Sequence, residues 1–256
     1  MRQEDRHTQP QPAPTASAGS PEIAVVAPVF NELENLESLH RRVAETLDGE
    51  HSWELVLVDD GSVDGSSEKM DELSAADPRV VVVHLDRNRG QTTATTVGVR
   101  NVRAPLVVTI DADLQSDPAD IRVLMGMLGT HDAVVGYRRR RNDNWVRRIS
   151  SRVANGVRNR LTGDAVRDTG CPLKLFRTEA FRSLPLFEGM HRFLPTLLRW
   201  HGYSVLEHPV SHHPRERGVS KYGVWNRVFR STRDLFAVRW MRSRIISARP
   251  PGSGAA

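Results

Sequence analysis

Acidic side chains gather at three points of this 256-residue chain, each directly after a short apolar run. Asn31 and Glu32 follow one run, Asp59 and Asp60 a second, and Asp111-Ala112-Asp113 a third. Carboxylate oxygens are hard ligands that suit Mg²⁺ or Mn²⁺, and these ions bridge phosphate groups. Each cluster alone is also typical of a polar turn, since Asp, Gly and Ser are turn residues. A second acidic pair at another strand end favours a binding site.

The third cluster has a spacing that could direct several oxygens at one ligand. Side chains at positions i, i+2 and i+4 of an extended segment project to the same side. On that geometry Asp111, Asp113 and Gln115 face a common ligand. The alternative is a polar turn that leads into a helix cap at Asp117.

The elements that must position these residues alternate between short apolar runs and amphipathic segments, which predicts a βαβαβ pattern in the first half of the chain. The runs are nearly all apolar, as in parallel strands that are covered on both faces. In such a sheet the nucleotide-binding crevice lies beyond the carboxyl ends of the strands. The expected strands are Ile23–Ala27, Leu55–Val58, Val80–His84 and Leu106–Ile110, and helices are expected at Leu33–Leu47 and from Asp117-Pro118 onward.

Composition limits the class of protein. Hydrophobic residues make up 39% and charged residues 26%, which excludes a chain without a core. We find no apolar run near the roughly 18 residues of a membrane-spanning helix, and residues 1–20 lack the apolar stretch of a secretory signal. The single cysteine excludes an internal disulfide framework. We therefore expect a cytoplasmic protein with disordered tails at residues 1–20 and 247–256.

Arginine is concentrated in two segments. Residues 138–160 hold nine Arg and one Asp, and residues 215–244 hold nine Arg or Lys and two acids. Arginine suits bidentate recognition of phosphate, although biased codon usage would also produce this excess. Nucleic-acid binding is an alternative of another class. That alternative explains the arginines only, because acidic strand ends would repel a polyanion.

Four segments in this order resemble a family 2 glycosyltransferase of GT-A fold. They are APVFNE (27–32), VDDGSVDG (58–65), DADLQSDP (111–118) and RGVSKY (217–222). The resemblance covers about residues 22–230 and is closest to the branch of dolichol-phosphate mannosyltransferases and bacterial polyprenyl-phosphate glycosyltransferases. TGCPLKLFR (169–177) and GMHRFLPTLLRWHGY (189–203) are similar to that branch as well. It implies a single α/β domain over residues 21–223, with a mostly parallel, Rossmann-like sheet flanked by helices.

The resemblance also implies a nucleotide-sugar donor, GDP- or UDP-linked, a divalent metal (Mg²⁺ or Mn²⁺) and an inverting transfer of one sugar. Carried over by motif, the nucleoside pocket is lined by Pro28, Phe30, Glu32, Val58 and Asp60. The metal and diphosphate site comprises Asp111, Ala112, Asp113 and Gln115, with Asp111 and Asp113 as the catalytic carboxylates.

The same branch holds phosphates with basic residues, which correspond here to Arg138, Arg147 or Arg148, and Arg215 with Lys221. The acceptor it implies is a polyprenyl phosphate, whose oxygen is already ionised at neutral pH, so positioning matters more than a strong base. A hydroxyl acceptor would need an Asp, Glu or His base. Glu188 and His191 are the candidates for that base, and structural roles are favoured for both.

Two enzyme alternatives differ in the acceptor or in the reaction. Family 2 also contains transferases that act on soluble hydroxyl acceptors. A sugar nucleotidyltransferase would need a glycine-rich loop and a following lysine, which the segment 28–32 does not contain. Processive relatives carry a Q-x-x-R-W sequence, whereas this chain has Thr196 in place of the glutamine. The sequence therefore favours a non-processive transferase acting at the cytoplasmic surface of a membrane.

The C-terminal segment Val224–Ile246 is expected to form a basic amphipathic helix. One stripe of it combines Leu235, Phe236 and Trp240 with further apolar residues, and arginines are interspersed. Such helices lie in membrane interfaces and favour anionic lipids. The alternative, equally supported by the pattern, is that the stripe packs on the domain core or on a second subunit.

Overall fold

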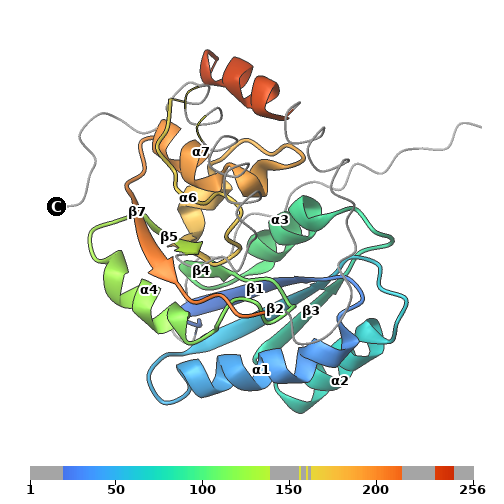
Figure 1. Cartoon of the computed structure of the whole chain (residues 1–256). Helices are drawn as coiled ribbons and strands as arrows, with labels where there is room; N and C mark the ends of the chain where they lie inside the picture. Colours follow the sequence, from blue (N-terminus) through green and yellow to red (C-terminus); the bar gives the residue numbers. More distant parts are fainter. Residues whose placement is uncertain (1–19, 139–155, 157–159, 161–162, 215–233, 245–256) are drawn as a thin grey trace, which may run out of the picture.

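The computed structural model describes residues 20–138, 156, 160, 163–214 and 234–244. A seven-stranded sheet runs through its centre in the order β3-β2-β1-β4-β6-β5-β7 (Figure 1). The pairs β3·β2, β2·β1, β1·β4 and β5·β7 are parallel, whereas β6 is antiparallel to both of its neighbours. The expected α/β, mostly parallel sheet flanked by helices is confirmed.

The element bounds follow the chain in order. The strands are β1 Ile23–Val29, β2 Trp53–Asp59, β3 Val80–His84, β4 Leu106–Thr109, β5 Ala133–Arg138, β6 Lys174–Arg177 and β7 Val205–Val210. The helices are α1 Leu33–Leu47, α2 Ser66–Ala76, α3 Gln91–Asn101, α4 Asp120–Leu128, α6 Thr178–Arg182 and α7 Leu194–Trp200, with a 3₁₀ turn η1 at Met190–Arg192.

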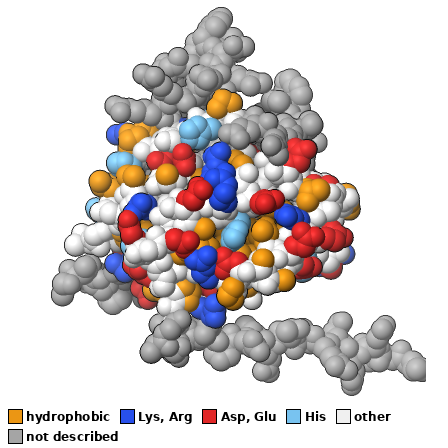
Figure 2. All heavy atoms as spheres, turned by 90° about the horizontal axis from the view of Figure 1, so that it is seen from below, with side chains coloured by type: hydrophobic (Ala, Val, Ile, Leu, Met, Phe, Trp, Pro, Cys, Tyr) orange, Lys and Arg blue, Asp and Glu red, His pale blue; other side chains and the backbone are white. Residues whose placement is uncertain are grey.

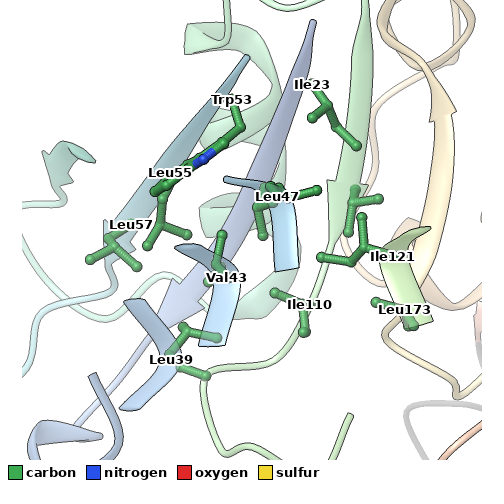
Figure 3. Close-up of a cluster of buried hydrophobic side chains, with 14 of the residues drawn as sticks. Ile23, Leu39, Val43, Leu47, Trp53, Leu55, Leu57, Ile110, Ile121 and Leu173 are labelled. Atoms are coloured by element: carbon green, nitrogen blue, oxygen red, sulfur yellow. The ribbon is translucent and has the colours of Figure 1, made fainter. Parts of the chain in front are cut away.

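Helices cover both faces of the sheet. On one face lie α1, α2 and α4, and on the other lie α3, α6 and α7 (Figure 1). Apolar residues of α1 at helical spacing, such as Leu39, Val43 and Leu47, are fully buried against Leu55 and Ile121 (Figure 3). Burying a side chain of this size contributes about 1.5–3 kcal/mol. The hydrophobic clusters between the sheet and its helices therefore fix the strand ends that carry the polar residues.

Most predicted elements are confirmed with small shifts. The strand Val80–His84 and the helix Leu33–Leu47 have the expected bounds, and β1 and β2 extend further than predicted. The expected helix start at Asp117-Pro118 is wrong, because a turn comes first and α4 begins at Asp120. Asp117 Oδ1 accepts a hydrogen bond from the Ala119 amide within that turn.

The expected apolar stripe, with Leu235, Phe236 and Trp240 on one face of the C-terminal helix, is wrong in the described part of that segment. Residues 234–242 are helical, and the rest of Val224–Ile246 lies outside the described residues. Leu235 and Val238 are buried in the cluster around α6 and α7, whereas Phe236 and Trp240 are 61% and 63% exposed. Leu235 and Phe236 therefore lie on different faces, as adjacent residues on a helix must. Within the part of the chain that the structure describes, no helix is long and apolar enough to cross a membrane.

Gly98 allows α3 to lie directly on the sheet. A Cβ atom at this position would overlap the side chain of Val26 in β1 and press on Val58 in β2. Both valines are fully buried, so neither can move into free space. The close approach of α3 to β1 and β2 thus depends on the missing side chain.

We predict that Gly98→Ala destabilises the fold by about 1–3 kcal/mol through overpacking. The matched control is Gly126→Ala in α4, where a Cβ meets nothing within 4 Å. That change should stabilise by about 0.5–1 kcal/mol, because alanine loses less backbone entropy in a helix. Urea unfolding monitored by circular dichroism measures both variants, and equal effects of the two changes would contradict this account of α3.

Candidate functional site

Three polar clusters meet at one edge of the sheet. They follow the carboxyl ends of β1, β2 and β4, which are adjacent and parallel. Among the described residues, the non-glycine positions with positive φ are Asn31 (54°) and Leu114 (58°), which lie just beyond β1 and β4. Such conformations cost energy and persist where the surroundings impose them, commonly at functional sites.

Two buried carboxylates at the end of β2 hold this edge together. Asp60 accepts hydrogen bonds from the amides of Arg89 (2.7 Å) and Gly90 (2.9 Å), which precede α3. Burial raises the pKa of Asp60 despite these bonds. Asp59 accepts bonds from the Ser62 amide (2.8 Å) and the Ser67 hydroxyl (2.5 Å). Asp59 and Asp60 are each 3% exposed, so these bonds replace most of their hydration.

The loops that follow β1 and β2 interlock. The Asn31 amide donates to the Ser62 hydroxyl (3.0 Å), and the Val63 amide donates to the Asn31 side chain (2.7 Å). One residue further on, the Glu32 amide donates to the Ser66 hydroxyl (2.9 Å). Any displacement of the loop after β2 is therefore transmitted to the loop that carries Phe30 and Glu32.

The segment between β3 and α3 is a part of the site that the sequence analysis missed. Its amides bind Asp60. The next residue, Gln91 at the start of α3, donates from Nε2 to Asp111 Oδ1 (2.8 Å), which joins this part of the chain to the loop after β4. The backbone of Arg87 and Asn88 passes so close to Gly61 that a Cβ there would clash. The polar run Arg87–Gln91 directly after a predicted strand was the available signal.

The segment after β4 differs from the expected extended chain. The strand ends at Thr109, residues 112–114 form a turn, and Asp113 Oδ1 accepts a bond from the Gln115 amide (3.1 Å). The prediction that Asp111, Asp113 and Gln115 project to the same side of an extended segment is therefore wrong. Asp111 and Asp113 nevertheless act on each other, because burial first and then the charge of Asp113 raise the pKa of Asp111 to about 6.

Basic groups lie behind this acidic pair. Lys174, at the start of β6, is 4% exposed and donates to the Cys171 carbonyl, and burial lowers its pKa. Arg138, at the end of β5, makes a two-point ion pair with Asp168 (2.7 and 3.0 Å). The charges of Lys174 and Arg138 both lower the pKa of Asp111, so they partly offset the acidic pair. Lys174 and Asp168 were not predicted as site residues.

The predicted nucleoside residues divide into two groups. Pro28, Phe30 and Glu32 are partly exposed, and Glu32 accepts a bond from the Asn35 side chain (2.7 Å). Val58 and Ala112, which are 0% and 2% exposed, are buried in the hydrophobic clusters.

Of the two candidate bases, His191 is built into the fold. Its Nδ1 lies 2.6 Å from the Thr92 hydroxyl, which also accepts a bond from the Gly189 amide (2.9 Å). Burial, followed by the charges of Arg192 and Lys174, lowers the pKa of His191 to about 3. A histidine in this state is a weak base at neutral pH.

The remaining predicted phosphate ligands, Arg147, Arg148, Arg215 and Lys221, lie outside the described residues. The segment just before Arg215 does reach the site. The His213 amide donates to the Gln115 carbonyl (2.8 Å), and its Nε2 lies 3.2 Å from Asp117. The chain after β7 therefore returns to the turn that follows Asp113.

In an open, mostly parallel α/β sheet the ligand-binding crevice lies beyond the carboxyl ends of the strands, where the three acidic clusters of this chain lie. The sequence profile described as glycosyl transferase family 2 matches residues 24–184. The chain belongs to this family. The matched residues include β1 except Ile23, the strands β2 to β6 and all three acidic clusters.

Two curated bacterial relatives are similar over most of the chain. A dodecaprenyl-phosphate galacturonate synthase from Rhizobium johnstonii is 39% identical over 224 residues, which cover 85% of this chain and 66% of the relative. An undecaprenyl-phosphate 4-deoxy-4-formamido-L-arabinose transferase from Edwardsiella ictaluri is 39% identical over 79% of this chain and 63% of the relative. The chain thus spans just under two thirds of the length of these relatives.

Solved structures confirm the GT-A fold. A mannosyltransferase from Pyrobaculum calidifontis, in complex with GDP-Man and Mn²⁺, superposes with a TM-score of 0.63 at 19% identity, over 95% of this chain and 70% of that one. A glucosyl-3-phosphoglycerate synthase from Mycobacterium tuberculosis, in complex with Mn²⁺, UDP and phosphoglyceric acid, gives 0.65 at 20% identity, over 89% and 80%.

We predict that Asp60→Ala releases the loop before α3. The amides of Arg89 and Gly90 lose their acceptor, which should cost about 1–3 kcal/mol and raise their hydrogen exchange. The matched control is Asp86→Ala, which removes the carboxylate paired with the Arg89 side chain but leaves both amides bound to Asp60. Unchanged protection of these two amides in Asp60→Ala would show that Asp60 does not hold this loop.

Proposed function

We propose that this chain transfers one sugar from a nucleoside diphosphate sugar to a polyprenyl phosphate, with inversion and without processive elongation. In this reaction the acceptor phosphate oxygen forms a bond to the anomeric carbon. The bond from that carbon to the donor diphosphate breaks, and the nucleoside diphosphate leaves with the electron pair. The observation that carries the proposal is the acidic pair Asp111 and Asp113, placed beside the interlocked loops of a family 2 fold.

The donor set of the acidic pair fits a divalent ion. Two carboxylates that repel each other in a buried setting favour a cation, and hard oxygens suit Mg²⁺ or Mn²⁺. No group of three or more His, Cys, Asp or Glu is arranged around a metal position among the described residues. Asp111 and Asp113 would hold the ion together with diphosphate oxygens, because Mg²⁺ is usually bound by one or two carboxylates and by phosphates of the substrate. When bound, the ion supplies charge neutralisation for the leaving diphosphate.

The interlocked loops would bind the nucleoside of the donor. Phe30 and Glu32 have accessible side chains after β1, and Asp60 fixes the facing loop before α3. The relatives at 39% identity are named for dodecaprenyl- and undecaprenyl-phosphate, which supports a lipid phosphate as acceptor.

The environment of His191 makes this residue unsuitable as the base for a hydroxyl acceptor. A hydroxyl needs a base near neutral pKa, whereas His191 has its pKa lowered to about 3 by burial and adjacent positive charge. An ionised phosphate needs a cation to position it instead. Arg138, oriented by Asp168, would be one such group on the described side of the site.

The exposed side of the helical residues 234–242 would bind the membrane surface. Phe236 and Trp240 are exposed there, and Arg239 and Arg244 are exposed beside them. Aromatic side chains with flanking arginines are typical of helices that lie in the lipid interface and attract anionic headgroups. The buried Leu235 and Val238 would anchor the helix to the domain.

The face of the sheet covered by α1 and α2 gives no support to nucleic-acid binding. On the face covered by α1 and α2, basic and acidic side chains are interspersed (Figure 2). A nucleic-acid footprint gathers basic side chains into a patch or stripe.

The proposal is tested by incubating labelled UDP- and GDP-sugars with polyprenyl phosphate in detergent and Mg²⁺ or Mn²⁺. We expect labelled product in the organic phase from one donor, with none when lipid or metal is left out. Donor hydrolysis without lipid product would contradict the lipid acceptor and favour a hydroxyl acceptor.

We predict that Asp113→Asn lowers the transfer rate at least about a hundred-fold, because it weakens the charge that holds the metal and diphosphate. The fold should remain intact, as judged by circular dichroism. Glu72→Gln, which neutralises an exposed carboxylate of α2, serves as the control and should retain full activity. Full activity of Asp113→Asn at saturating Mn²⁺ would remove Asp113 from the site.

We predict that the double change Phe236→Ala and Trp240→Ala weakens binding to vesicles containing phosphatidylglycerol by roughly ten-fold or more, since each aromatic ring loses its apolar burial. Val123→Ala with Met127→Ala is the matched control, because these exposed apolar residues lie on α4, on the other face of the sheet. Sedimentation with vesicles measures both. Equal binding by the two variants would place the membrane contact elsewhere.

A further inference from the structure

A histidine on the edge strand contacts the buried carboxylate that organises the site. His84 is the last residue of β3, and its Nδ1 lies 3.2 Å from Asp59 Oδ2. Its Nε2 lies 2.9 Å from Asp71 Oδ1 on α2. The side chain of Asp59 is 4% exposed, whereas those of His84 and Asp71 are 42% and 64% exposed. His84 thus lies between a buried inner carboxylate and an exposed outer one.

This geometry selects one protonation state of the ring. Ionised carboxylates only accept hydrogen bonds, so both ring nitrogens must donate, and only the imidazolium form carries two N–H groups. The bonds to Asp71 and Asp59 accordingly raise the pKa of His84 against the opposing effect of burial. Asp71 from α2 and Asp59 from β2 are the charged groups that act on the ring most strongly among the described residues.

Loss of the ring proton would affect the inner contact. Asp71 is exposed and can turn toward water, but Asp59 is held by Ser62 and Ser67. A neutral ring can still donate to Asp59 through Nδ1, although the bond is then no longer assisted by charge and is roughly half as strong. Burial alone would raise the pKa of Asp59, and the bonds from Ser67, Ser62 and His84 together lower it.

A continuous path joins this contact to the expected donor pocket. Asp59 binds the Ser62 amide, the Ser62 hydroxyl accepts from the Asn31 amide, and Asn31 in turn binds the Val63 amide. These bonds fix the loop after β1 against the loop after β2. Both loops carry residues proposed to contact the nucleoside.

We propose that His84 is a positioning residue for the donor: as an imidazolium it holds Asp59, and through Asp59 the two loops that bind the nucleoside diphosphate. The inference rests on the proposed function for the identity of the ligand. Its consequence is a donor affinity that falls as the pH rises through the titration of His84.

The test is the Kd of UDP and of GDP, each with Mg²⁺, measured by calorimetry from mildly acidic to alkaline pH in the wild type and in His84→Gln. Glutamine keeps one neutral donor and cannot titrate, so subtracting its profile removes the titration of the nucleotide and of other groups. We expect the ratio of wild-type affinity to His84→Gln affinity to fall roughly three- to ten-fold from mildly acidic to alkaline pH. Superimposable pH profiles of the two proteins would overturn the proposal.

Asp71→Asn supplies an independent variant, because it retains His84 and Asp59 but removes the outer charge. Its loss of affinity should occur at lower pH than in the wild type, since the imidazolium is less stabilised. A merely structural role for His84 would change the unfolding midpoint without moving this pH dependence, so thermal unfolding is recorded alongside.

Protection of the Ser62 and Val63 amides from hydrogen exchange separates this proposal from the proposed function. If neither nucleotide binds the wild type, the proposed donor class is wrong. The role of His84 in holding the two loops together, here called the clamp, still predicts that amide protection falls when His84 loses its proton. It also predicts that His84→Gln abolishes this change. Protection that is independent of pH in the wild type, after correction for intrinsic exchange, would overturn the clamp itself.

Discussion

Burial of ionised carboxylates at the end of β2 is the constraint on which the rest of this site depends. Asp59 and Asp60 are almost inaccessible to water, so each must be satisfied by donors from elsewhere in the chain. Those donors come from the loops after β2 and β3, and Gln91 extends the connection to Asp111 beyond β4. One set of hydrogen bonds therefore ties three strand ends into a single surface. A parallel sheet brings strand ends near one another, but these bonds fix their relative position.

The balance of charge at this surface suits the divalent ion and the anionic ligand that we propose for it. Asp111 is driven toward its neutral form by burial and by Asp113, while Lys174 and Arg138 act in the opposite sense. Lys174 is itself buried, and Arg138 is already paired with Asp168, so the compensation is incomplete. A divalent ion with a diphosphate would add positive charge at the acids and negative charge toward the basic side. The same fold without such a ligand retains an unfavourable concentration of like charge.

The sequence predicted the β-strands β1 to β4 and α1 because a sheet that is covered on both faces demands continuous apolar runs, and a helix on it demands helical spacing. It did not predict that β6 lies antiparallel between β4 and β5, since strand order depends on distant contacts. The role of Arg89 and Gly90 was missed because their backbone amides perform it, and every residue type carries an amide. The prediction of an extended segment from Asp111 to Gln115 was wrong because the chain turns at Leu114. Asp111 and Asp113 are nevertheless close enough to interact.

The central proposal is that a nucleoside diphosphate and a divalent ion bind together at Asp111 and Asp113. Membership of family 2 and the convergence of the acidic strand ends support it. The most direct measurement is the anomalous diffraction of Mn²⁺ in crystals grown with UDP or GDP. The account predicts a manganese peak in contact with the Asp113 carboxylate and the nucleotide diphosphate, with the base between the loops that follow β1 and β2. A nucleotide bound at another edge of the sheet, or manganese bound away from both carboxylates, would contradict it.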